Sequence, residues 1–123
     1  MPEDFLHYND IIINSTGTGT LGRIGIFRKG DNPRNIKIIP DSHITTVRVS
    51  SSNLNSLYVY YFLKYNQSHF EDSGVGSTNQ KELKPETVSE FLIAIPPMDE
   101  QTAIITKISE LFSSFDCIEA SLK

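Results

Sequence analysis

The chain has 123 residues, of which 38% are apolar and 21% charged, a composition typical of a single soluble globular domain. Its apolar runs fall far short of the roughly 20 residues that a membrane span needs. Its acidic N-terminus lacks the features of a signal peptide, so we expect a cytoplasmic protein with no membrane partner. The single cysteine, Cys117, excludes an intrachain disulfide, and the net charge of −4 argues at first against a nucleic-acid partner.

The first part of the chain shows the pattern of short strands separated by polar turns. Residues 15–22 consist mainly of serine, threonine and glycine, and residues 29–35 combine glycine, aspartate, asparagine and proline, so both segments predict loops. β-Branched residues dominate the segments around these loops. The predicted strands are residues 10–14, 23–28, 36–39 and 44–49.

The pattern changes to helix after residue 50. Residues 56–65 are apolar and aromatic, and Ser56 is the expected N-cap of a buried helix. Residues 73–81 are a polar loop, and residues 85–90 predict a short helix that opens at its proline. Residues 91–95 predict a last strand, which two consecutive prolines bring to an end.

Residues 98–123 contain neither glycine nor proline and predict one long helix with acidic residues near its start. Six large apolar residues recur in it at spacings of 4, 3, 4, 3 and 4, the heptad seam of a coiled coil. The seam consists of Ile104, Ile108, Leu111, Phe115, Ile118 and Leu122. We therefore expect a pairing helix beyond a first unit of residues 1–97, with a helix docked on its own domain as the alternative.

Charge is distributed unevenly along the chain. Residues 22–50 hold six Lys and Arg against two Asp, a net of +4, whereas residues 51–123 hold five bases against ten acids, a net of −5. Phosphate binding depends on the local field more than on the total charge. The basic segment therefore allows a nucleic-acid contact, and an ordinary solvated face is the alternative.

A glycine motif, G-x-G-x-x-G, occupies Gly17, Gly19 and Gly22 after a predicted strand. The dinucleotide fingerprint also requires a helix to open at the third glycine, so that its N-terminus meets the pyrophosphate. Here Ile24 and Ile26 alternate with Gly25, which indicates a second strand. The motif therefore favours a hairpin loop whose backbone amides approach a DNA phosphate, and a nucleotide-binding enzyme fragment is the weaker hypothesis.

The other reactive residue types form no catalytic or metal-binding pattern. His7, His43 and His69 lie far apart in the sequence, and none pairs with another ligand at helical spacing. Residues 41–43 have the residue types of a triad, but adjacent strand residues point to opposite faces. We expect His43 to enter a strand next to a DNA contact, and Cys117 to be a small packing residue of the last helix.

Three stretches in a fixed order resemble a known family. They are residues 10–25 (DIIINSTGTGTLGRIG), residues 76–83 (GSTNQKEL) and residues 95–101 (IPPMDEQ) leading into the heptad helix, and residues 41–44 (DSHI) also fit. Together they resemble a target-recognition domain of the specificity subunit of type I restriction-modification enzymes. The resemblance implies an α+β fold, with a small mixed β-sheet, packed helices and a long C-terminal coiled-coil helix.

The resemblance also implies a function without an active site. A full specificity subunit carries two recognition domains, each reading half of a split site in double-stranded DNA, held apart by two antiparallel helices. Modification and restriction subunits are its partners, and the methyltransferase subunit binds S-adenosylmethionine, so this chain needs no cofactor. The chain has one recognition segment and one helix and begins partway through the pattern, so we expect a truncated or half subunit that forms a homodimer.

The residues expected to contact DNA follow from the charge pattern and from the resemblance. Arg and Lys pair with guanine in the major groove, and Asn and Gln pair with adenine. The expected DNA-binding residues are Arg23, Arg28, Lys29, Arg34, Lys37, His43, Thr78, Asn79 and Gln80. The glycines expected to shape the loop backbone are Gly17, Gly19, Gly22 and Gly76. A coiled-coil interaction module that does not bind DNA remains the other open class.

Overall fold

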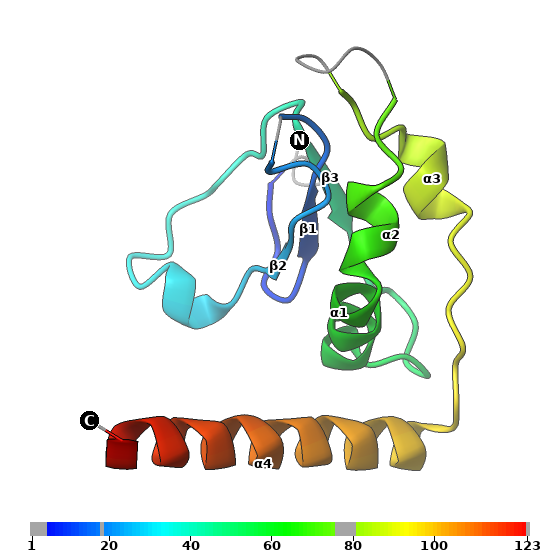
Figure 1. The fold of residues 1–123 in the computed structure, drawn as a ribbon. Coiled ribbons are helices and arrows are strands. Elements are labelled where there is room, and N and C mark those ends of the chain that lie inside the picture. The colour runs from blue at the N-terminus through cyan, green and yellow to red at the C-terminus, as the bar shows by residue number, and fades with distance from the viewer. Residues whose placement is uncertain (1–4, 18, 76–80, 123) are drawn as a thin grey trace.

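A computed structural model describes residues 5–17, 19–75 and 81–122. In these residues a three-stranded antiparallel sheet has the order β2-β1-β3, with β1 (Ile11–Asn14) between β2 (Ile24–Ile26) and β3 (Ile44–Val47). Ile13 pairs with Ile24 on one side and with Thr45 on the other. Helices pack beside this sheet, which confirms the expected α+β class (Figure 1).

Alternation along β1 explains why one face of the sheet is buried. Ile11 and Ile13 are fully buried, while Ile12 points to the other face, where its neighbours are Gly25 and Thr46. The buried face packs against the helices on one side of the sheet (Figure 1). The core consists of Ile11, Ile13, Leu21, Ile24, Val59, Leu63, Phe70 and Leu83.

Three short helices follow the sheet: α1 (Ser56–Tyr65), α2 (Gln67–Glu71) and α3 (Pro85–Ser89). The expected N-cap of α1 is wrong by one residue, because the Asn55 side chain accepts the Leu57 amide at 2.8 Å. The helix α3 opens at its proline, as predicted. The sequence did not indicate α2, which follows α1 after a single residue.

Two of the predicted strands are wrong, because neither segment joins the sheet. Residues 36–39 lie in the long connection between β2 and β3, which also holds a short 3-10 helix, η2 (Lys29–Asp31). Residues 91–95 form an extended connector from α3 to the last helix, and Leu92 is 88% exposed. β-Branched composition alone does not supply the neighbouring strand that a ladder needs.

The last helix, α4 (Met98–Leu122), confirms the predicted long helix. Its 25 residues span about 37 Å at a rise of about 1.5 Å per residue. It packs beside α1, where the Tyr61 and Phe112 rings lie 6.3 Å apart, and continues across the molecule (Figure 1). In the described part of the chain, no helix is both long and apolar enough to cross a membrane.

Candidate nucleic-acid interface

Four of the expected DNA-binding residues lie on one exposed connection. This connection, residues 27–42, is called the basic arm here; it leaves the sheet after β2, loops away from the helices and leads back to β3 (Figure 1). The side chains of Arg28, Lys29, Arg34 and Lys37 on it are all exposed. Its two acids form local turns, since Asp31 accepts the Arg28 amide at 2.9 Å and Asp41 accepts the His43 amide at 2.8 Å. The arm therefore presents cations to solvent.

Asparagines hold the basic arm in one shape. The buried Asn32 side chain donates to the Ile36 carbonyl at 2.7 Å and accepts the Ile36 amide at 3.1 Å, which closes the turn that contains Arg34. Asn35, at φ 52°, adopts the left-handed conformation that asparagine tolerates. Its Oδ1 accepts the Tyr8 hydroxyl at 2.8 Å. The turn is therefore ordered before any ligand binds.

The segment before β1 supports the arm from one side. The Leu6 amide donates to the Ile38 carbonyl at 2.7 Å, and the Tyr8 ring stacks on Phe27 with centroids 5.5 Å apart. The Lys37 ammonium lies 5.3 Å from the centre of the Phe5 ring, within the range of a cation–π contact. A cavity of about 340 Å³ lies between this segment and the arm.

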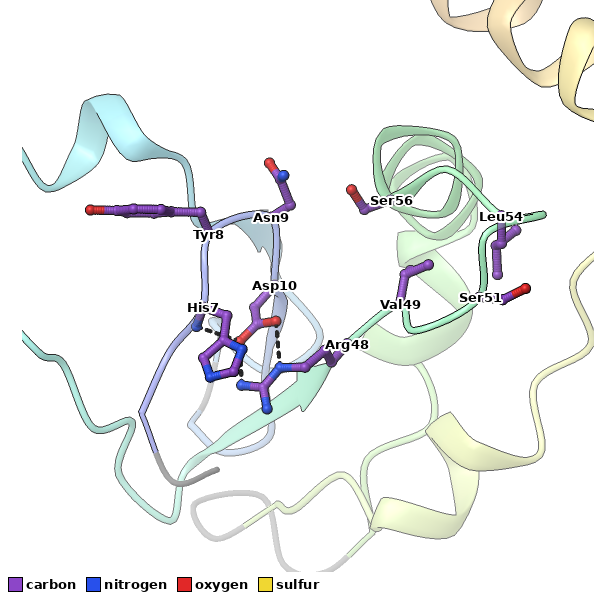
Figure 2. Close-up of a pocket in the computed structure, with 9 residues that line it drawn as sticks. All are labelled: His7, Tyr8, Asn9, Asp10, Arg48, Val49, Ser51, Leu54 and Ser56. Atoms are coloured by element: carbon purple, nitrogen blue, oxygen red, sulfur yellow. Dashed lines mark hydrogen bonds and ion pairs between the residues drawn. The ribbon is translucent and has the colours of Figure 1, made fainter. Parts of the chain in front are cut away.

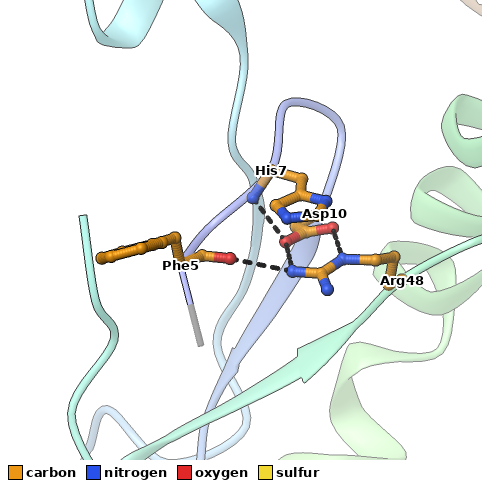
Figure 3. A network of polar contacts seen from close by, with 4 residues as sticks. All are labelled: Phe5, His7, Asp10 and Arg48. Carbon is orange, nitrogen blue, oxygen red and sulfur yellow. Dashed lines mark hydrogen bonds and ion pairs between the residues drawn. The ribbon is translucent and has the colours of Figure 1, made fainter. Parts of the chain in front are cut away.

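An ion pair connects the same segment to β3. Arg48 donates from Nε to Oδ1 of Asp10 at 2.9 Å and from Nη2 to Oδ2 at 2.7 Å, and Nη2 also donates to the Phe5 carbonyl at 3.0 Å (Figure 3). The Asp10 side chain is 2% exposed, and its carboxylate also accepts the His7 amide. Its hydrogen bond raises the pKa of the Arg48 guanidinium above the ordinary value. Arg48 is also exposed, but its guanidinium is bonded within the fold, to Asp10 and to the Phe5 carbonyl.

A second cavity, of about 270 Å³, opens beside this ion pair. Its walls come from the turn before β1 and from the segment between β3 and α1, and Asn9 and Ser56 face each other across it (Figure 2). Asp10 already accepts three hydrogen bonds, so its charge is used within the fold. The cavity is therefore polar, but the Asp10 carboxylate in its wall is already hydrogen-bonded within the fold and is not available to bind a ligand.

The glycine loop lies at the opposite end of β1 and has the predicted hairpin form. Gly17, Gly19 and Gly22 all have positive φ, at 99°, 81° and 87°. A Cβ on Gly22 would lie 2.5 Å from the Glu71 backbone nitrogen, so this glycine allows the loop to pack on α2. The strand β2 begins at Ile24, and the helix that a dinucleotide site requires does not open at Gly22.

Two further expected DNA contacts lie at this glycine-loop end and not on the arm's outer turn. Ser15 donates its amide and its hydroxyl to the His43 carbonyl at 2.8 and 2.7 Å, and the Asn14 amide donates to the Arg23 carbonyl. The Arg23 and His43 side chains are exposed there. Val75 pairs with Glu82 at the same end. The remaining expected residues, Gly76, Thr78, Asn79 and Gln80, lie outside the described residues.

The reactive side chains gather into no catalytic group in the described part of the chain. No cluster of three or more His, Cys, Asp and Glu residues there could hold a metal ion. His69 packs against Phe70 and Phe91, with ring centroids 5.3 and 5.2 Å away. The expected packing role of Cys117 is wrong, because that thiol is exposed on α4.

Comparison with known families gives one match over nearly the whole chain. A family model described as the type I restriction modification DNA specificity domain matches residues 3–123. The chain belongs to this family. The match confirms the resemblance seen in the sequence, and it gives this specificity domain a role in DNA recognition within a type I restriction-modification system.

The heptad seam of this specificity domain has two different environments. Ile104 and Ile108 are half-buried at the start of α4, beside an apolar groove of about 240 Å³ whose other wall is α1. The later seam residues are exposed: Leu111 by 47%, Phe115 by 61%, Ile118 by 55% and Leu122 by 82%. Residues 111–122 are called the free half of α4, and at its start the Phe112 ring still lies 6.3 Å from Tyr61 of α1. The alternative of a helix docked on its own domain therefore holds for the first half only.

Sequence reasoning missed the residues that hold the specificity domain's elements together. Asp10 was read as part of a strand and Arg48 as one base among six, and their separation of 38 positions gave no sign of pairing. Gln101 ends the IPPMDEQ stretch, which predicts no role for it, yet its side chain is fully buried. Its three hydrogen bonds go to residues 5 to 48 positions away, so its neighbours in the sequence carry no signal of its burial.

Proposed function

We propose that this specificity domain acts as a non-catalytic half subunit that binds double-stranded DNA. In this proposal residues 1–97 form a partial target-recognition domain and residues 98–123 a pairing helix. The observation that carries it is the basic arm, which holds four exposed cations in a fixed shape within an otherwise acidic chain. An ordered arm loses little entropy when DNA binds.

The arm and the glycine-loop end would contact DNA in different ways. Arg28, Lys29, Arg34 and Lys37 on the arm are the candidates for phosphate contacts and for guanine readout in the major groove. Arg23 and His43 lie beside the glycine loop, whose backbone would approach a phosphate. Asn79 and Gln80, with Thr78, stay predictions for the base contacts at this end.

The free half of α4 supports pairing with a second copy of the chain. Four large apolar side chains are too many for an ordinary soluble surface, and burying each is worth roughly 1.5–3 kcal/mol. An antiparallel pair centred between Leu111 and Phe115 would place Ile108 opposite Ile118, and Ile104 opposite Leu122. Such a homodimer holds one recognition segment at each end and would read a symmetric, split site.

The remaining partners follow from the family. The modification subunits would dock on the paired helices and bring the methyltransferase site with its S-adenosylmethionine, and the restriction subunits would join that assembly. This chain would contribute target recognition alone. A coiled-coil module that does not bind DNA is the competing function, and the exposed seam is compatible with it.

Selection from a random pool of duplex DNA tests the proposal. The full chain is incubated with the pool at moderate salt, and the bound duplexes are recovered, amplified and sequenced. We expect enrichment of two inverted half-sites separated by a spacer of constant length. A single uninterrupted site would contradict the paired geometry, and no enrichment would favour the interaction module.

A further inference from the structure

Gln101 is the one polar residue of the described part of α4 that is buried, and its whole amide group is bonded. Its Oε1 accepts the Asn55 amide at 2.9 Å. Its Nε2 donates to the Asn53 carbonyl at 3.0 Å and to the Pro96 carbonyl at 2.9 Å. One side chain therefore joins the segment before α1, the connector before α4 and α4 itself.

The contact with Asn55 links the starts of two helices. Asn55 caps α1, because its Oδ1 accepts the Leu57 amide at 2.8 Å, while its own amide donates to Gln101 in the first turn of α4. Each of these bonds is directional and partly shielded from water. The angle between α1 and α4 is therefore determined by hydrogen-bond geometry as well as by packing.

The connector before α4 is held to the core at Phe91 and Ile93, but its later residues are less well held. Leu92 and Ile95 are 88% and 58% exposed, and the connector pairs with no described strand. The Tyr58 hydroxyl holds it at the Ala94 carbonyl, at 2.6 Å. Beyond that point, the Pro96 carbonyl is held by Gln101.

We propose that Gln101 is the positioning residue that fixes the direction in which α4 leaves the sheet and the short helices. Residue 117 lies 16 positions beyond it, about 24 Å along the helix, so a swing of about 15° moves that point by about 6 Å. A displacement of about 6 Å corresponds to about two base steps of 3.4 Å. This inference rests on the proposed function: in a pair of chains that binds DNA, the direction of α4 sets the spacer length between the two half-sites.

A distance measurement within one chain tests the direction of α4. One spin label is placed on the native Cys117, which is exposed and lies outside the heptad seam, and another on Thr46→Cys on the outer face of the sheet. Excess unlabelled Cys117→Ser chain ensures that both labels of a measured pair belong to one molecule. We expect one narrow interspin distance distribution in the native background.

The test variant is Gln101→Met, which keeps the side-chain length and the helix propensity but removes all three hydrogen bonds. We expect its distance distribution to broaden, by up to about 6 Å for a swing of about 15°. The matched control is Gln67→Met. Gln67 also accepts a distant amide, that of Ile24 at 3.1 Å, but it joins α2 to β2 and not to α4. The control distribution should stay narrow.

An equally narrow distribution in Gln101→Met overturns the proposal. If that variant does not fold, hydrogen exchange in the native chain decides: the Asn55 amide should exchange much more slowly than the Asn53 amide, which bonds to an exposed serine hydroxyl, and equal rates overturn it. In the duplex selection, the Gln101→Met chain should enrich half-sites separated by a wider range of spacer lengths than the native chain does. If its spacer length is as constant as that of the native chain, the direction of α4 does not set the distance between half-sites. Failure of the native chain to bind DNA would count against the proposed function alone.

Discussion

The basic arm and the free half of α4 are both exposed, but they differ in chemistry and in support. The arm presents cations on turns closed by Asn32 and braced by Tyr8, whereas the free half of α4 presents large apolar side chains on a helix held at its first turn. Exposed charge is stable in water, and an exposed apolar seam is not. The difference indicates two separate partners, an anionic one for the arm and a protein for the helix.

The largest effect is expected from charges in the seam. Leu111→Glu with Phe115→Glu removes two buried contacts from each helix of a pair, about 3–6 kcal/mol, which corresponds to a loss of about 100-fold or more in association. Light scattering measures the mass across a concentration series. The matched variant, Ser109→Glu with Ser113→Glu, adds the same charge to the outer face of α4 and should still associate. If both variants associate equally well, the chains do not pair through the heptad seam.

The second effect concerns the support of the arm. Asp10→Ala removes three hydrogen bonds and leaves Arg48 without its partner, at a cost of about 2–3 kcal/mol, because Arg48 can still reach water. Chemical denaturation measures the free energy of unfolding. Asp41→Ala is the control, since that exposed carboxylate also accepts one backbone amide and should cost less than about 1 kcal/mol. If the two variants lose similar amounts of unfolding free energy, the buried ion pair stabilises the fold no more than an exposed carboxylate does.

The third effect is on DNA binding and separates the arm from the rest of the surface. Arg28→Ala with Lys29→Ala should weaken duplex binding about tenfold. If both bases contact phosphates, the slope of the logarithm of the binding constant against the logarithm of the salt concentration should become shallower by about two. Lys84→Ala with Lys107→Ala changes the net charge by the same amount away from the arm. Fluorescence anisotropy over a salt series compares them. Equal effects of the two pairs would mean that net charge, and not the arm, governs binding.

The smallest effect should come from Tyr8→Phe, which removes the hydroxyl that donates to Asn35 but keeps the ring stacked on Phe27. An exposed hydrogen bond of this kind contributes less than about 1 kcal/mol to folding. Amide exchange of residues 32–36 is therefore the more sensitive measurement, and it should accelerate. Unchanged exchange would show that Asn32 alone orders the turn.

Local patterns in the sequence predicted the elements whose partners are close in the chain. A short apolar run gave β1 and alternation gave β2, the proline gave the start of α3, and the absence of glycine and proline gave α4. Residues 36–39 and 91–95 share the composition of strands, but pairing is a property of the neighbour and cannot be read from one segment. The fold class followed from the family resemblance, because the ordered motifs carry information about long-range arrangement.

The candidate site was predictable in its chemistry but not in its geometry. Charge counting found the exposed cations of the arm, yet it could not show that Arg48 is paired with Asp10 or that Arg23 and His43 lie at the glycine-loop end. The heptad spacing runs along the whole of α4, but periodicity does not specify what covers a seam. The distinction between a half covered by α1 and a free half needed the three-dimensional structure.

Sedimentation equilibrium of the native chain most directly tests the claim that this specificity domain works as a paired half subunit. The free half of α4 predicts a reversible monomer–dimer equilibrium, with twice the chain mass at tens of micromolar and a shift toward monomer on dilution. Addition of duplex carrying both half-sites should give a complex of two chains and one duplex. A chain that remains monomeric at these concentrations, with and without DNA, would contradict the account.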